Sequence, residues 1–233
     1  MRLYKPSRLQ PSSVIERHHH ARPYATVILS GCYEEAGDAG RYRVEAGDVL
    51  FHGAFSAHQD RISDKAAQVI DLPLPLENSH WPARGRIADP DHLVRLSESD
   101  PVAAVRQLLN AFRPVAPAEP DLPDQLADAL RCAAPLAIGE WADSVGRSRE
   151  HVSRAFFQLY GVSPARYRSE ARARRAWQEI VTQKLSLAAI ATDAGYADQA
   201  HMTRAIKSLT GLTPTAWRKW KLGASERAVV DGD

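Results

Sequence analysis

The sequence predicts an α+β protein of two domains, an N-terminal small β-barrel or jelly roll and a C-terminal all-α domain. Three observations support this prediction: short apolar segments separated by glycine-containing turns across 13–73, prolines at every third residue across 114–123, and one helical pattern that occurs at 146–167 and again at 196–217. At 233 residues the chain is long enough for two domains that each bury their own core.

The N-terminal strands are predicted from runs of β-branched and aromatic residues bounded by Gly and Asp. Four such runs lie at 24–30, 41–45, 49–52 and 68–72. Many short strands with regular glycine punctuation favour a sandwich or barrel over alternating strands and helices. A helix is expected at 100–112, because its apolar residues fall on one helical stripe: Val102, Val105, Leu108, Leu109 and Phe112.

A proline-rich spacer separates the predicted domains. Pro114, Pro117, Pro120 and Pro123 follow the three-residue repeat of a polyproline helix, which is a semi-rigid linker. We therefore predict a first domain at 1–112, a linker at 113–123, a helical domain at 124–222 and a disordered tail at 223–233. A docking motif for another protein is the alternative interpretation of the prolines.

The helical domain is predicted to contain one two-helix unit twice. The first copy has a turn at Gly146, a cap at Ser148 and a helix that buries Val152 and Phe156. The equivalent positions of the second copy are Gly195, Asp198, Met202 and Ile206. A helix at 165–182, about 27 Å long at about 1.5 Å per residue, connects the copies. Successive major-groove faces on one side of a DNA duplex lie about 34 Å apart, so this helix suits two recognition helices on one duplex.

The outer faces of the two capped helices carry polar and basic side chains. They are Arg149, Glu150, Ser153 and Arg154 in the first copy, and Gln199, Ala200, Thr203, Arg204 and Lys207 in the second. A short helix pair with such a face has the form of a helix-turn-helix unit that enters the major groove. Two ordinary helical hairpins with solvated faces are the alternative.

Charge is distributed unevenly along the chain, although the formal net charge is only +2. Residues 1–123 carry 14 basic and 16 acidic side chains, whereas 135–222 carry 14 basic and 7 acidic ones. The helical half is therefore the part suited to a polyanion. No apolar run is long enough for a secretory or membrane segment, and Cys32 and Cys132 form no metal-type pair, which together favour a cytoplasmic protein and no membrane partner.

Residues 135–220 resemble the DNA-binding domain of the AraC/XylS family of bacterial transcription regulators. The resemblance rests on the paired units, the connecting helix and the segment IATDAGYADQAHMTRAIKSLTGLTPTAW. It implies a transcription regulator rather than an enzyme, with double-stranded DNA as its partner. It also implies that the chain can form a homodimer, and that it contacts RNA polymerase if it activates transcription. The implied base-reading positions are Glu150, Ser153, Arg154, Gln199, Ala200 and Arg204. Met202 and Ile206 stand where this family often has aromatic residues, and Glu150 and Ala200 prevent transfer of a known operator sequence.

The segment EAGDVLFHGAFSAHQD is similar to the second conserved box of cupins, small jelly rolls that often serve as sensor domains. This similarity implies a small-molecule effector pocket. It also implies His18, His20 and His58 as ligands of a divalent metal, but no carboxylate follows the first two histidines at the expected spacing. We therefore expect no cofactor and assign these histidines to an effector pocket, with a divalent metal in the cupin-like domain as the alternative. A metal-dependent cupin enzyme or metal sensor with a helical appendage is the alternative function, and a barrel that only dimerises is a third.

Overall fold

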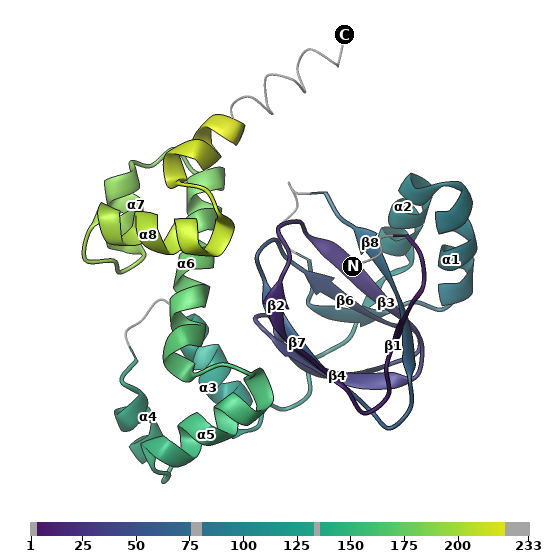
Figure 1. Cartoon of the computed structure of the whole chain (residues 1–233), viewed down its shortest axis with the longest axis horizontal. Coiled ribbons are helices and arrows are strands. Elements are labelled where there is room, and N and C mark those ends of the chain that lie inside the picture. Colours follow the sequence, from purple (N-terminus) through teal and green to yellow (C-terminus); the bar gives the residue numbers. More distant parts are fainter. Residues whose placement is uncertain (1–3, 76–80, 133–135, 222–233) are drawn as a thin grey trace. The chain divides into compact units, whose positions relative to one another are not determined.

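The computed structural model describes residues 4–75, 81–132 and 136–221 (Figure 1). The chain divides into two compact units, residues 1–128 with 147–163 and residues 129–146 with 164–233. Strands occupy the first part of the chain and helices dominate after residue 121, which confirms the α+β class. The domain limits at 112 and 124 remain a prediction, and the tail predicted to be disordered lies outside the described residues.

Two antiparallel sheets form the N-terminal part. The larger is ordered β1-β8-β3-β6-β9-β10, with β1 Ser7–Leu9, β8 Ala67–Pro73, β3 Tyr24–Ser30, β6 Asp48–His52, β9 Arg84–Arg86 and β10 Arg113–Pro114. The smaller is ordered β2-β7-β4-β5, with β2 Val14–His19, β7 Ala57–Ile62, β4 Cys32–Gly37 and β5 Gly40–Glu45. This strand order is that of a jelly roll of two sheets, in agreement with the predicted small β-barrel or jelly roll.

The inner faces of both sheets pack together. One buried cluster combines Ile28, Leu50 and Val69 of the larger sheet with Tyr33 and Ile62 of the smaller sheet. Because side chains alternate between the faces of a strand, residues two apart along β3 point to this same inner side.

The outer face of the larger sheet is covered by helices α1 (Pro90–Ser99) and α2 (Pro101–Ala111). Ala25 and Val27 of β3 share a buried cluster with Leu93 of α1 and Leu108 of α2. Aspartates cap both helices: the side chain of Asp89 accepts the backbone N–H of His92, and that of Asp100 accepts the N–H of Ala103. The predicted helix at 100–112 is α2, whereas α1 was not predicted.

Both ends of the predicted proline spacer have regular secondary structure. Arg113 and Pro114 form β10, which pairs with β9, and Pro123 lies in the first turn of α3. Proline is tolerated at both kinds of position, because an edge strand and a first helical turn need no donor from it. Only residues 115–121 lack regular secondary structure.

The helices that follow are α3 Leu122–Arg131, α4 Ile138–Ser144, α5 Arg149–Tyr160, α6 Pro164–Thr182, α7 Leu187–Asp193 and α8 Gln199–Thr210, and residues 214–221 are also helical. The long connecting helix predicted at 165–182 is α6. Its buried Trp177 meets the ring of Trp217 edge-on at 5.5 Å, and the indole N–H of Trp217 donates to Thr210. Across the described ranges, no helix has both the length and the apolar character needed to cross a bilayer.

Candidate DNA-binding surface and effector cavity

Helices α7 and α8 form the second predicted helix-turn-helix unit. The Ser186 side chain caps α7 by accepting the N–H of Ala189, and Asp198 caps α8 by accepting that of His201. Gly195, in the turn between the helices, has a φ of 73°, a conformation that glycine adopts without steric cost. The turn and the cap of α8 are therefore as the sequence predicted.

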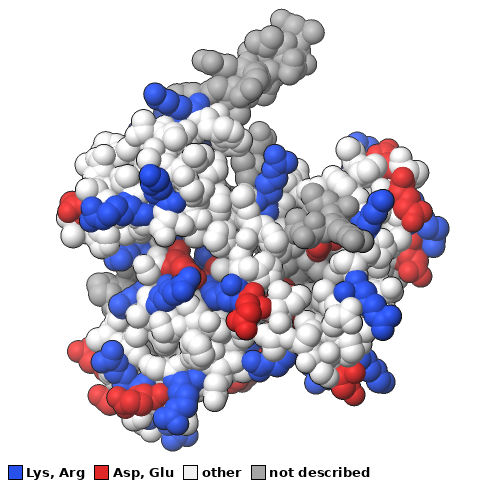
Figure 2. Space-filling model, in the orientation of Figure 1, with Lys and Arg blue, Asp and Glu red and all other residues white. Residues whose placement is uncertain are grey.

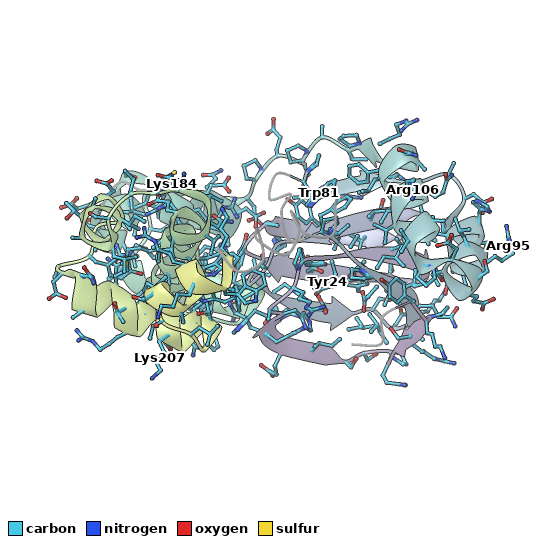
Figure 3. All side chains as sticks on the ribbon, turned by 90° about the horizontal axis from the view of Figure 1, so that it is seen from above. Tyr24, Trp81, Arg95, Arg106, Lys184 and Lys207 are labelled. Carbon is cyan, nitrogen blue, oxygen red and sulfur yellow. The ribbon has the colours of Figure 1, made fainter. Side chains whose placement is uncertain are left out.

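One face of α8 is buried and the opposite face is exposed. Met202 and Ile206 have no exposed surface, and α8 contacts both α7 and α6. Four of the five predicted DNA-contacting residues are exposed and Thr203 is half-buried: Gln199, Ala200, Thr203, Arg204 and Lys207. Lys207 points away from its helix (Figure 3). The buried stripe thus fixes the helix while the polar face stays accessible to a large partner.

Helix α5 carries the equivalent residues of the first copy. Ser148 caps it by accepting the N–H of His151, and Gly161 ends it in the left-handed conformation with a φ of 66°. Val152 and Phe156 are buried, as predicted. Arg149, Glu150 and Arg154 are exposed and Ser153 is half-buried.

The arginines of α6 have a structural role that the sequence does not reveal. Three of them donate to main-chain carbonyl oxygens: Arg168 to Leu136, Arg172 to Gly195 and Arg175 to Arg131. The guanidinium of Arg172 also lies over the ring of Tyr196, 4.4 Å from its centre. These contacts stabilise α6 against its neighbours and reduce the number of cations available for phosphate.

Exposed cations with no intramolecular polar contact among the described residues remain on the helices and their connections. They are Arg149, Arg154, Lys184, Arg204, Lys207 and Lys219. Figure 2 shows Lys and Arg side chains spread over the helical part of the chain, with acidic groups interspersed. On the face shown, these cations are separated from one another by other side chains.

We expect the Asp198→Ala variant to lose about 1 kcal/mol of unfolding free energy, because the first turn of α8 then has an unsatisfied N–H. Urea unfolding followed by circular dichroism measures this loss. Asp198→Asn, which keeps the accepting oxygen, is the matched control and should unfold close to the wild type. Equal losses in both variants would show that the side-chain hydrogen bond is not the cause.

A cavity of about 630 Å³ lies between the two sheets. Polar residues from both sheets line it: His18, His20, Tyr24, Thr26, Glu35, His58, Asp60 and Asp71. Apolar lining comes from Leu9, Ile15, Tyr33 and Val69. Figure 3 shows Tyr24 among the strands. The volume suits a small organic molecule, and the mixed lining can bind both apolar and polar groups.

The three histidines predicted from the sequence meet in this cavity. The ring of His18 lies 4.9 Å from that of His20 and 4.5 Å from that of His58, centre to centre. One nitrogen of each lies within 4.8 Å of the others. Nδ1 of His18 is 2.9 Å from the carbonyl oxygen of Glu16, which leaves Nε2 for a ligand. The structure therefore brings these residues together, and their role in binding remains a prediction.

Buried carboxyl groups beside the histidines were not predicted. Glu35 and Asp60 face each other across β4 and β7 and are only 4% and 7% exposed. Burial raises the pKa of Asp60 to about 7, with a further contribution from Asp71. Burial, followed by the charge and the hydrogen bond of Asp60, raises the pKa of Glu35 well above its usual range. The cavity thus contains the carboxylates that the sequence pattern lacked.

His52 was also missed, although it stacks on Tyr24 with ring centres 4.4 Å apart. Burial lowers the pKa of His52 to about 3 and that of His58 well below 6.5, with smaller contributions from neighbouring histidines. Both rings are therefore neutral at pH 7. Strand alternation is the signal that could have identified His52, since it places this residue on the same side of β6 as the inward-facing Leu50.

The sequence profile of a family described as "Helix-turn-helix domain" matches residues 141–219. Among solved structures, an AraC-type regulator from Chromobacterium violaceum is 24% identical and is similar over 43% of this chain and 91% of its own, with a TM-score of 0.40. A probable AraC family regulator from Rhodopseudomonas palustris CGA009 is 18% identical over 43% and 96%, with a TM-score of 0.40. ToxT from Vibrio cholerae is 10% identical over 92% and 96%, with a TM-score of 0.42.

No curated protein sequence matches the chain. The profile covers α7, the turn at Gly195 and α8, whose caps, buried stripe and polar face have been described above. Residues 141–219 therefore form a helix-turn-helix domain.

Proposed function

We propose that this protein is a sequence-specific DNA-binding transcription regulator of the AraC type, acting in the cytoplasm. The observation that carries the proposal is the geometry of α8, whose polar face is exposed while Met202 and Ile206 are fully buried behind it. A helix held in this way within a helix-turn-helix domain can enter the major groove without rearrangement of its core.

In the proposed complex, Arg154 and Arg204 read guanine, because a guanidinium matches the O6 and N7 acceptors of that base with two hydrogen bonds. Glu150, Ser153 and Gln199 contact neighbouring bases, and Ala200 fits against a thymine methyl group. The remaining predicted contacts position the helices on the sugar-phosphate backbone: Arg149, Thr203 and Lys207.

The cavity between the sheets is the proposed effector site. Its volume of about 630 Å³ and its mixed lining support a small organic ligand. Ligand that binds only the folded protein raises its melting temperature, so a thermal-shift screen tests this part of the proposal. A homodimer, and RNA polymerase in the case of an activator, are the proposed protein partners.

Genomic DNA fragments selected by the purified full chain, followed by affinity measurements on the enriched site, test the proposed function. We expect Arg204→Ala to weaken binding to this site by about 5- to 160-fold, which corresponds to roughly 1–3 kcal/mol for one bidentate contact. Preference at one base pair should also relax. Random DNA should be affected much less.

Arg204→Lys is the matched control, because lysine keeps the charge but lacks the planar pair of donors. We expect this variant to retain its affinity for random DNA and to lose the preference for the selected site. Equal losses on selected and random DNA in both variants would contradict base reading by Arg204. Failure to enrich any fragment would contradict the function as a whole.

A further inference from the structure

A chain of hydrogen bonds at the inner face of the larger sheet determines the tautomer of His52. The Thr26 hydroxyl donates to Oδ1 of Asp71 at 2.8 Å, and its oxygen lies 3.3 Å from Nε2 of His52. A hydroxyl group has only one proton, so Thr26 must accept from His52 Nε2–H. Nδ1 of His52 therefore carries a lone pair and no hydrogen.

This lone pair faces an oxygen of the Glu35 carboxyl group. Nδ1 of His52 lies 3.6 Å from Oε1 of Glu35, and the two side chains are 4% and 6% exposed. The separation is too long for a proton shared in a hydrogen bond, which needs about 2.5–3.2 Å. In contrast, two ligands at about 2.0–2.2 Å from a tetrahedral ion lie roughly 3.3–3.6 Å apart.

His58 supplies a third donor at the same place. This residue is 5% exposed, it lines the cavity, and its Nδ1 has no hydrogen-bond partner. One ligand atom from each of Glu35, His52 and His58 lies within 4.8 Å of the other two. A buried polar atom without a partner is unfavourable, and a bound ion would remove that cost.

We propose that Glu35, His52 and His58 bind one divalent transition-metal ion, with Zn²⁺ as the ion whose preferred ligands and distances they match. Two imidazoles and one carboxylate form a known zinc ligand set that leaves a fourth position open. Since Glu35 and His58 line the cavity, a ligand in the cavity can reach that position. Thr26 is a positioning residue, because it orients the His52 ring through Nε2.

This set differs from the histidines predicted from the sequence and shares only His58 with them. The set of His18, His20 and His58 contains no anion, and its first two members are half-buried. In the proposed set all three residues are buried, and the Glu35 carboxylate offsets part of the charge of a divalent ion. Charge and burial therefore favour the proposed set.

Calorimetric titration of the chelator-treated full chain with ZnCl₂, together with elemental analysis after dialysis, tests the proposal. We expect one tightly bound ion per chain. Glu35→Gln and His52→Gln should lose this ion, whereas the matched variants His18→Gln and His20→Gln should retain it. Thr26→Val should weaken binding by about 10- to 100-fold, the effect typical of removing an outer-shell partner.

Two further measurements separate loss of the ion from loss of the fold. The metal-free variants should show the near-ultraviolet circular dichroism of the metal-free wild type. Co²⁺ bound to the wild type should give the visible spectrum of a four-coordinate ion, and Glu35→Gln should abolish it.

Absence of stoichiometric Zn²⁺ in the wild type would overturn the proposal. The opposite pattern would also overturn it: folded Glu35→Gln and His52→Gln retain the ion, while His18→Gln and His20→Gln lose it. That result would assign the ion to the histidines predicted from the sequence. The proposal is independent of DNA binding, because selection of genomic fragments tests the helical domain separately.

Discussion

Raising the NaCl concentration from about 50 to about 200 mM is expected to weaken binding to the selected DNA site by about 10²-fold. This estimate assumes that Arg154 and Arg204 contact bases and that the other exposed cations without an internal polar contact displace counterions from phosphates, at about 0.9 ions per contact: Arg149, Lys184, Lys207 and Lys219. The logarithm of the binding constant should then fall with the logarithm of salt concentration with a slope of roughly −4. Fluorescence anisotropy on a labelled duplex at several salt concentrations measures the slope.

Lys219→Gln supplies the control for this prediction, since Lys219 is exposed and lies outside α8. We expect it to reduce the slope by about one without changing the preference for selected over random DNA. A wild-type slope near −1 would contradict the assignment of these exposed cations to phosphate contacts, because binding would then release almost no counterions. An unchanged slope in the variant would remove Lys219 from the contact set.

Ile206→Ala is expected to reduce the unfolding free energy by about 2–5 kcal/mol. Ile206 has no exposed surface and lies on the face of α8 that packs within the second unit, so truncation leaves a cavity as well as lost apolar burial. Urea unfolding followed by far-ultraviolet circular dichroism measures the change. The affinity for DNA should also fall under conditions in which the variant is partly unfolded.

The neighbouring residue gives a sharp comparison. Lys207 is exposed, so Lys207→Ala should alter stability by no more than about 0.5 kcal/mol while it weakens DNA binding. The two variants therefore separate the buried and exposed sides of one helix. If Ile206→Ala left the urea midpoint unchanged, the proposed packing of α8 would be wrong.

Helices α5 and α8 could be predicted because their signals are local. Gly146 and Gly195 mark the turns, Ser148 and Asp198 lie one residue before each helix, and apolar residues follow with a period of 3.6. None of these signals depends on a distant part of the chain. In contrast, the distance between α5 and α8 on a DNA duplex depends on parts of the chain that are far apart in sequence, and it remains a prediction.

The cavity could be predicted only in part, because its residues come from strands far apart in the sequence. Glu34 and Glu35 are adjacent, and only the register of β4 decides that Glu35 faces inward beside Asp60. The α6 arginines show the same limit. The carbonyl oxygens that bind Arg168 and Arg172 belong to residues 32 and 23 positions away along the chain.

Strand β3 separates a mixed polar and apolar cavity side, which contains Thr26, from an apolar side, where Val27 packs against the helices α1 and α2. Inserting or deleting one residue within β3 would exchange these two sides. The Thr26 hydroxyl would then enter the apolar core beneath the helices, and the Val27 side chain would replace it beside Asp71. Length changes should therefore be tolerated at loops such as 115–121 but not within this strand, whatever residue is inserted.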